Sequence, residues 1–379
     1  MEYKVWHQLL TTADFILFFL FMCAVGYLFI FAIFSFKNQK VNFKKTNKKY
    51  RFLILFTAHK IDENIYKSLD SFYNQDFPDQ NFDIAIAAGK VSDSAEKEFD
   101  RSPVTLIKSP GDERFRSGIL EYTLQKIHSE YDIIVIMKAG NTVDPNFLEE
   151  INKAYHSGVM AVQTHFTSKN LKTSTAILNA LSQEINNSIF RRGHVNLGFS
   201  AGLIGSGMAF NYEWFRKNIS KVKKNGLTKQ LETLLLRQGI FIEYLENIYT
   251  YDERKRSSSK SSGHRQHWYS AKFYSLGSAI TELPKAFLAG NFDFCDKIIQ
   301  WIIPSRFFLL FTIGIISIIL IFIDWTLCLK WFGLLFVIFL VFDLSIPTKF
   351  HNSRTFFALF SLPILYISNF INYFRIVKK

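Results

Sequence analysis

The 379-residue chain carries 45 Lys and Arg against 32 Asp and Glu, a formal net charge of +13, and 49% of its residues are hydrophobic. The apolar content excludes a disordered tail protein, and three Cys are too few for a small secreted disulfide scaffold. The 41 Phe residues crowd at the two ends of the chain, where long apolar runs exclude a purely soluble protein.

The first apolar run, from Phe15 to Phe36, holds 22 residues without a charge. At 1.5 Å per residue it is long enough to cross a hydrocarbon core of about 30 Å. We therefore expect residues 1–36 to form a transmembrane helix and not a cleaved signal peptide. A basic juxtamembrane linker follows at residues 37–50. The positive-inside rule then predicts an external N-terminus, a cytoplasmic main domain and an integral protein of the bacterial cytoplasmic-membrane type.

The positive charge is concentrated near the membrane segments, above all between Lys37 and Arg51. Attraction to anionic lipid explains this placement more simply than binding to a polyanion. We therefore expect membrane lipid as a partner and no nucleic acid.

Residues 51–268 have the pattern of a soluble α/β domain. Strands are predicted at 51–58, 82–88, 104–107, 132–137, 159–163 and 203–210, and helices at 61–73, 118–128 and 227–239. Alternation of strands and helices at this spacing predicts a parallel sheet with helices on both faces. Sites in such sheets lie beyond the carboxyl ends of the strands, so chemistry is expected just after Ala58, Ala88 and Met137.

The domain ends in a polar, basic loop at 254–266, which is either a solvated linker or a mobile loop that gates a site or contacts lipid. Residues 269–303 mix aromatic and polar residues at helical spacing. We expect them to form amphipathic helices along the membrane surface.

Residues 304–379 form the C-terminal membrane region. Two spans are predicted at 307–323 and 325–342, as a tight hairpin with its tip outside. A fourth apolar segment, 356–374, either spans or lies in the interface. On the premise that the spans carry no internal ionisable residue, we expect neither a channel nor a transporter.

Five segments carry further information. They are VDPNFL (143–148), AVQTHFTSKN (161–170), LGFSAGLIGSGMAF (197–210), LTKQLE (227–232) and HRQHW (264–268). Together with the order of spans and soluble domain, they resemble the membrane-bound family 2 glycosyltransferases of processive type. The resemblance covers about 50 to 306. It implies an α/β GT-A-like (Rossmann-like) cytoplasmic domain plus transmembrane α-helices.

The same resemblance implies which positions should carry chemistry. In that family one Asp holds the nucleotide, an Asp-x-Asp motif holds a divalent metal on the diphosphate, and another Asp is the general base. At those places this chain has Gly89, then Lys138 and Gly140, then Gln230. Glycine supplies no ligand, a lysine ammonium repels a metal ion, and an amide accepts no proton at neutral pH. We therefore expect degenerate catalytic positions and no metal cofactor.

Three hypotheses remain open. The first is a catalytically inactive pseudo-glycosyltransferase that serves as a structural or regulatory subunit of a membrane assembly, with a different protein as its partner. Whether the chain also forms a homo-oligomer stays open. The second is an active, metal-independent glycosyltransferase that moves a sugar from a nucleotide-sugar to a membrane-associated acceptor. The third is a sensor that binds a nucleotide-sugar without turnover. Donor or phosphate binding would fall to Arg116, Lys138, His264, Arg265, His267 and Trp268, and the base would be one of Asp93, Asp144, Glu232 and Asp252.

Overall fold

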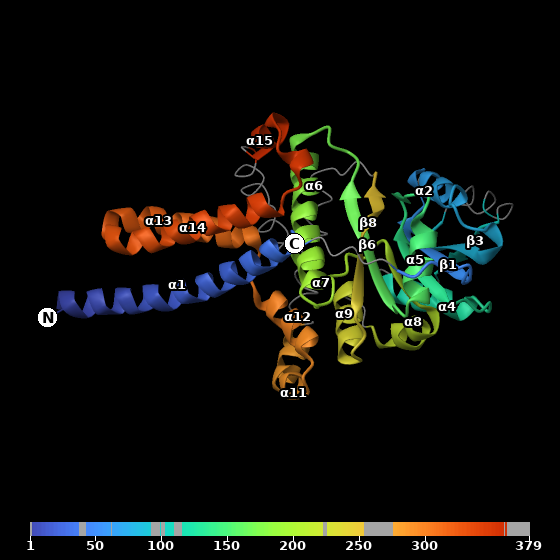
Figure 1. The fold of residues 1–379 in the computed structure, drawn as a ribbon, viewed down its shortest axis with the longest axis horizontal. Helices are drawn as coiled ribbons and strands as arrows, with labels where there is room; N and C mark the ends of the chain where they lie inside the picture. The colour runs from blue at the N-terminus through green and yellow to red at the C-terminus, as the bar shows by residue number, and fades with distance from the viewer. Residues whose placement is uncertain are drawn as a thin grey trace.

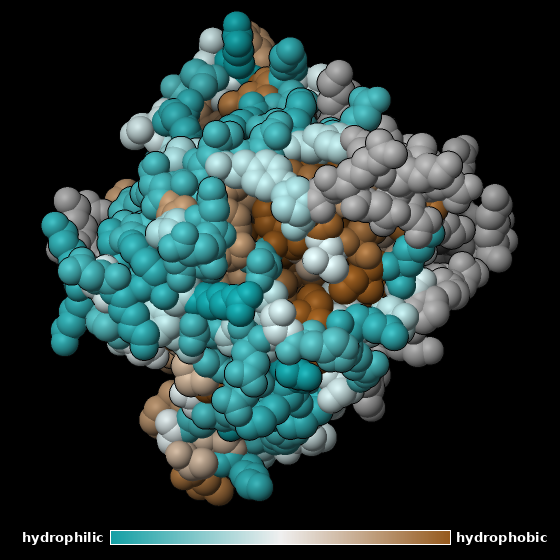
Figure 2. Space-filling view, turned by 90° about the vertical axis from the view of Figure 1, so that its right-hand side faces the viewer, coloured by the Kyte–Doolittle hydropathy of each residue, from teal (hydrophilic) through white to brown (hydrophobic). Residues whose placement is uncertain are grey.

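The chain consists of a bundle of long helices joined to an α/β domain (Figure 1). The architecture comes from a computed structural model, which describes residues 2–37, 43–61, 63–91, 99, 103–109, 116–222, 226–253, 276–359 and 361. Figure 2 views the domain from the side opposite the long helices. That face is mainly hydrophilic and has a hydrophobic hollow near its centre.

Three helices are long and apolar enough to cross a membrane. They lie within α1 (Glu2–Phe34), α13 (Arg306–Ile323) and α14 (Trp325–Ser345). The length and apolar character of the three predicted spans are confirmed, whereas their insertion in a membrane and their orientation stay predictions. Asp324 separates α13 from α14 and caps the second helix, because its carboxylate accepts hydrogen bonds from the backbone N–H groups of Thr326 and Leu327.

The premise of charge-free spans is wrong at Lys330, which lies in α14. Its ammonium pairs with the carboxylate of Asp14 in α1. The Trp331 Nε1–H donates to the same carboxylate at 2.7 Å. Charged groups in hydrocarbon are costly unless paired, so this contact ties α1 to α14. Of the fourth apolar segment, only the part in α15 (Ser353–Leu359) and Ser361 is described, and the rest lies outside the described residues.

The domain is built on an eight-stranded mixed sheet in the order β3-β2-β1-β4-β7-β6-β8-β5. The strands are β1 (Phe52–Lys60), β2 (Phe82–Lys90), β3 (Thr105–Lys108), β4 (Ile133–Lys138), β5 (Asn141–Val143), β6 (Ala161–Ser168), β7 (Met208–Asn211) and β8 (Ile242–Asp252). The first four strands in the order, β3 to β4, are parallel, as predicted.

In the second half of the sheet β6 and β8 pair in parallel, but the prediction of a parallel sheet is wrong for the other strand pairs. Strand β7 runs antiparallel to both β4 and β6, and β5 runs antiparallel to β8. Strand β7 is also shorter than predicted, because Gly205 and Gly207 have φ of +89° and +63° and interrupt extended backbone. Alternation of apolar segments reveals strands but does not determine their direction.

Two apolar cores cover the two faces of the sheet. Along β1, Phe52, Ile54 and Phe56 enter one core, and Leu53 and Leu55 enter the other. This alternation is the period of two that a strand imposes. The helices are α2 (Asn64–Tyr73), α4 (Arg116–Lys126), α5 (Phe147–His156), α6 (Ser174–Asn187), α7 (His194–Asn196), α8 (Tyr212–Asn218), α9 (Leu227–Arg237), α11 (Leu283–Leu288) and α12 (Phe292–Ile302).

The domain meets the bundle of long helices through a π-helical turn, η2 (Ser188–Gly193), that follows α6. A Cβ placed on Gly193 would lie 2.1 Å from the backbone oxygen of Phe31 in α1. Glycine is therefore needed for this close approach. Next to it, the Asn196 side-chain amide donates to the Phe34 carbonyl at 2.9 Å, which satisfies a backbone acceptor at the end of α1.

Candidate functional site

The candidate site lies where β1 and β4 end. Lys138 is the last residue of β4, and its backbone N–H donates to the Ser206 hydroxyl at 3.1 Å. Gly140 follows in a left-handed turn with φ of +84°, and its N–H donates to the Ser68 hydroxyl at 2.9 Å. The Ser206 hydroxyl in turn donates to Asn141 Oδ1 at 2.7 Å. Backbone and small polar side chains therefore fix the turn in which the resemblance implies a metal motif.

Arg116, at the start of α4, reaches across this edge of the sheet. Its Nε donates to the Thr57 hydroxyl at 2.7 Å, and its Nη1 donates to the Gly205 carbonyl at 2.5 Å. A longer bond, 3.3 Å, joins Nη2 to the Met137 carbonyl. A predicted phosphate ligand thus directs several of its donors at the protein itself, and it joins β1, β4 and the glycine-rich segment.

Two cations meet beside the glycine-rich loop, residues 198–207. A Cβ placed on Gly205 would lie 3.0 Å from Arg116 Nη1 and 3.4 Å from Lys138 Nζ. It would also lie 3.2 Å from the methyl group of Thr228, which precedes Gln230 in the first turn of α9. The fold therefore brings together residues that are as many as 112 positions apart in the printed sequence, the separation of Arg116 and Thr228. Both cationic side chains therefore line the same small region beside Gly205.

These side chains do not fit a divalent cation. Hard cations such as Mg²⁺ need carboxylate or carbonyl oxygens, whereas the turn offers an ammonium at Lys138 and no side chain at Gly140. Across the part of the chain that the structure describes, no three or more His, Cys, Asp or Glu side chains gather in a metal-binding group.

Glu232, a candidate base, is a structural anchor. It is fully buried in α9, where Lys229 Nζ donates to its two oxygens at 3.0 and 2.7 Å. The Leu203 backbone N–H donates to Oε1 at 2.7 Å. Burial lowers the pKa of Lys229. The charge of Glu232 raises that pKa but does not offset the effect of burial. The pair holds the glycine-rich loop on α9.

Of the other predicted residues, the structure describes Asp144, Asp252 and Gly89 and not the rest. Asp144 accepts a hydrogen bond from the Tyr249 N–H at 3.0 Å, and Asp252 is buried at the end of β8. Gly89 lies within β2 and not after it. The remaining predicted positions, namely Asp93, the loop 254–266, His264, Arg265, His267 and Trp268, lie outside the described residues.

Three residues that anchor the glycine-rich loop were not predicted from the sequence. Gln163 is fully buried in β6, donates to the Ser206 carbonyl at 3.1 Å and accepts from the Ile204 N–H at 2.9 Å. From α12, the Asp293 carboxylate accepts from the N–H and hydroxyl of Ser200 at 2.7 and 2.5 Å. Lys297 Nζ donates to the Ser200 carbonyl at 3.1 Å. The charged residues Asp293 and Lys297 stand within the otherwise apolar helix α12, and this pattern could have indicated buried polar contacts.

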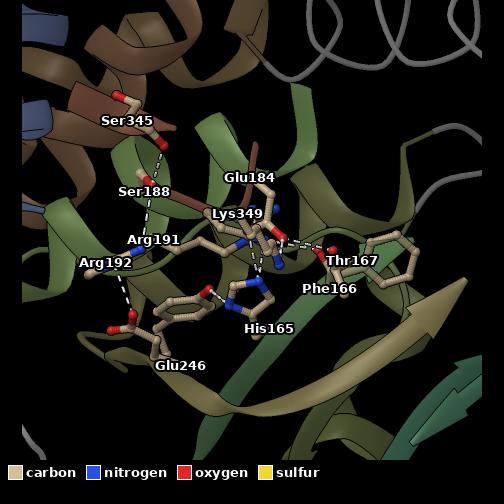
Figure 3. A network of polar contacts seen from close by, with 12 residues as sticks. His165, Phe166, Thr167, Glu184, Ser188, Arg191, Arg192, Glu246, Ser345 and Lys349 are labelled. Atoms are coloured by element: carbon tan, nitrogen blue, oxygen red, sulfur yellow. Dashed lines mark hydrogen bonds and ion pairs between the residues drawn. The ribbon is translucent and has the colours of Figure 1, made fainter. Parts of the chain in front are cut away.

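A second buried polar network joins the domain to the end of α14 (Figure 3). The fully buried carboxylate of Glu184 in α6 contacts His165 Nε2 at 3.0 Å, and it accepts from the Thr167 hydroxyl at 2.8 Å and Lys349 Nζ at 2.9 Å. Burial raises the pKa of Glu184, but the hydrogen bond and charge of His165 and the charge of Lys349 outweigh it and lower the pKa to about 2. The network is a tether between β6, α6 and the C-terminal region.

Comparison with known proteins supports the fold. No protein-family model matches the chain, and no curated protein matches it. Among solved structures, it is similar to the mannosyltransferase PcManGT from Pyrobaculum calidifontis in complex with GDP-Man and Mn²⁺, with a TM-score of 0.54 and 14% identity over 88% of this chain and 96% of that chain.

Two other solved structures resemble the chain at lower scores. TarS of S. aureus, residues 1–349, has a TM-score of 0.44 and 12% identity over 86% of this chain and 91% of that chain. Glucosyl-3-phosphoglycerate synthase from Mycobacterium tuberculosis has a TM-score of 0.42 and 12% identity over 60% and 80%. The predicted fold class is confirmed as a GT-A-like mixed α/β domain with three helices long and apolar enough to cross a membrane. Loss of the catalytic motifs stays a prediction.

Proposed function

We propose that this chain is a membrane-anchored protein of GT-A-like fold that acts as a non-catalytic structural or regulatory subunit of a membrane assembly. The observation that carries the proposal is the turn after β4, where Lys138 and Gly140 occupy the positions at which the family resemblance implies metal-binding carboxylates. Sugar transfer from a nucleotide-sugar builds negative charge on the leaving diphosphate, and a fixed metal is the usual means of neutralising it.

Two described carboxylates near the candidate site support the same proposal. A general base needs an oxygen within reach of the acceptor hydroxyl. Glu232 is buried against Lys229, and Asp144 accepts from a backbone N–H. Gln230, at the place of the family's base, is an amide. The polar groups in this region hold the fold together, which is what a scaffold requires.

A second candidate is a metal-independent glycosyltransferase acting on a membrane-associated acceptor. The convergence of Arg116 and Lys138 beside Gly205 favours it, because two fixed cations can bind a diphosphate without a metal ion. In that case the cations would neutralise the leaving group, and one of the remaining predicted carboxylates, Asp93 or Asp252, would act as the base.

The proposed topology places the main domain in the cytoplasm and the N-terminus outside. Basic residues support it, since Lys37, Arg306 and Lys349 all lie at the domain-side ends of the three long helices. A protease added to right-side-out cells should leave the domain intact and digest it after the cells are opened.

Transfer activity tests the proposal. The full chain in nanodiscs would be incubated with a panel of nucleotide-sugars and a membrane lipid extract, and release of nucleoside diphosphate would be measured. We expect no release above a heat-denatured control, and none for the single variants Gly140→Asp and Gln230→Asp. Turnover by the unmodified chain would contradict the proposal, and its persistence in chelator would establish the second candidate. Binding in chelator without turnover would point to a nucleotide-sugar sensor.

A further inference from the structure

Residues 174–196 form one continuous helix with an irregular turn inside it. Helix α6 runs directly into the π-helical turn η2, and η2 runs directly into α7. A π-helical turn closes its hydrogen bonds one residue further along the chain than an α-helical turn. Such turns are rare and occur frequently at functional sites. The neighbours of η2 therefore show what holds it in this geometry.

The two ends of η2 are bound to two of the long helices. At its first residue, the Ser188 hydroxyl donates to the carbonyl of Ser345, the last residue of α14, at 2.8 Å (Figure 3). Both side chains are buried. At its last residue, Gly193 packs on the backbone of Phe31 in α1 so closely that no Cβ would fit. A shift of α1 or α14 must therefore act on η2 first.

The middle of η2 holds the glycine-rich loop, residues 198–207. Arg191 is 4% exposed, and its Nε donates to the Gly202 carbonyl at 2.9 Å. The Gly202 N–H donates in return to the Phe190 carbonyl at 3.0 Å. A Cβ placed on Gly202 would lie 3.4 Å from that same carbonyl oxygen. The turn and the loop are therefore in direct contact and joined by two hydrogen bonds.

A continuous path of hydrogen bonds leads from the segment after α14 to this loop. Lys349 Nζ donates to Glu184 Oε1 at 2.9 Å, and Asn187 Nδ2 donates to Glu184 Oε2 at 3.4 Å. Arg191 Nη1 donates to Asn187 Oδ1 at 2.7 Å, while its Nε binds Gly202. Glu184, Asn187 and Arg191 are all buried, so a broken step leaves a buried polar group without its partner.

Strand β8 is irregular where it faces η2. The pairing of β6 with β8 passes from Leu245 directly to Tyr249, so the three residues between them form a bulge. Glu246, in this bulge, pairs with Arg192 of η2 at 3.2 Å (Figure 3). Bulges are common next to functional sites, where they redirect a side chain. An irregular turn and an irregular strand therefore meet at the joint between the domain and the long helices.

We propose that η2 is a conformational relay, through which the end of the α13–α14 hairpin sets the position of the glycine-rich loop. When the contacts at the hairpin end are lost, η2 relaxes to α-helical geometry and turns the residues after it by about 100°, the angle of one residue. This turn withdraws Arg191 from Gly202. A membrane protein that binds the hairpin in one of the two arrangements thereby changes the shape of the candidate site. The inference goes beyond the proposed function, because the relay acts in a scaffold and in an enzyme alike.

Hydrogen exchange of the full chain in nanodiscs tests the relay from its far end. Lys349→Met removes the ammonium from Glu184, and amide exchange across residues 198–207 should speed up by about fivefold or more, because a hydrogen bond to a charged group is lost at the start of the path. Lys172→Met, exposed beside the start of α6, is the matched control and should leave the loop unchanged. Exchange in β1 should stay the same in both variants, which excludes a global loss of stability. Unchanged loop exchange in Lys349→Met would refute the relay.

A double variant distinguishes a relay from two independent contacts. Arg191→Lys keeps the buried positive charge, but an ammonium does not reproduce the planar fork that binds Gly202 and Asn187 together. In that background Lys349→Met should add no further acceleration, because the path is already cut. In an Arg192→Lys background, where the substituted side chain pairs with Glu246, Lys349→Met should keep its full effect. If the effects of Arg191→Lys and Lys349→Met simply multiplied, the two contacts would be independent and the proposal would be overturned.

Discussion

The buried pair in α9 gives the sharpest prediction on stability. Lys229→Ala removes the ammonium that donates to both oxygens of Glu232, and it leaves a fully buried carboxylate with the Leu203 N–H. Removing one partner of a buried ion pair costs about 3–5 kcal/mol, because the remaining charge stays buried. At about 2–4 °C per kcal/mol for a domain of this size, the melting temperature should fall by about 6–20 °C.

Intrinsic tryptophan fluorescence of the full chain in nanodiscs, recorded during heating, measures this change. The double variant Lys229→Met with Glu232→Gln should recover most of the loss, since a neutral amide still accepts from Leu203 and no buried charge remains. Lys217→Ala is the control: its partner Glu213 lies one turn away on the exposed surface, and the melting temperature should not change. If Lys229→Ala melted within about 2 °C of the unmodified chain, the anchor role would be refuted.

Gly193→Ala should destabilise the docking of α1 by about 3 kcal/mol, because its Cβ meets a backbone oxygen at 2.1 Å, whereas Gly26→Ala has nothing within 4 Å and should be neutral in the same thermal melts. Glu184→Gln should flatten the pH dependence of stability. Its folded pKa is lowered from 4.5 to about 2, so a contribution of about 3 kcal/mol is present above pH 4.5 and is lost as the pH falls toward 2. Denaturation midpoints from about pH 6 to 3.5 measure the slope, and an unchanged slope would exclude the tether. Lys330→Met should lower stability, and exchanging the charges of this lysine and its aspartate partner in α1 should restore it; an exchange no better than the single variant would argue against the pair.

The strands that flank the candidate site could be predicted because each is a short apolar run that ends at a polar turn. The runs at 51–58, 82–88 and 132–137 correspond to β1, β2 and β4. Strand direction was not predictable, because β7 inserts antiparallel between β4 and β6 after a long excursion of the chain. The periodicity of apolar residues indicates which side chains are buried, but it does not determine the order or direction of the strands.

The candidate site was predictable only at the level of positions. Residues after strand ends, such as Lys138, were expected at the sheet edge and lie there. Contacts between residues far apart in the sequence could not be predicted from the sequence alone. Asp14 and Lys330 are 316 residues apart, and neither local sequence indicates that the two side chains pair. Asp293 and Ser200 meet only because α12 folds back onto the domain.

Native copurification tests the central claim most directly. The chain would be tagged at its own locus, extracted gently from the membrane, and its stoichiometric partners identified by mass spectrometry. A non-catalytic subunit should come out with at least one other membrane protein in fixed ratio. Isolation alone, or only with further copies of itself, would contradict the scaffold role and leave the metal-independent transferase as the leading candidate.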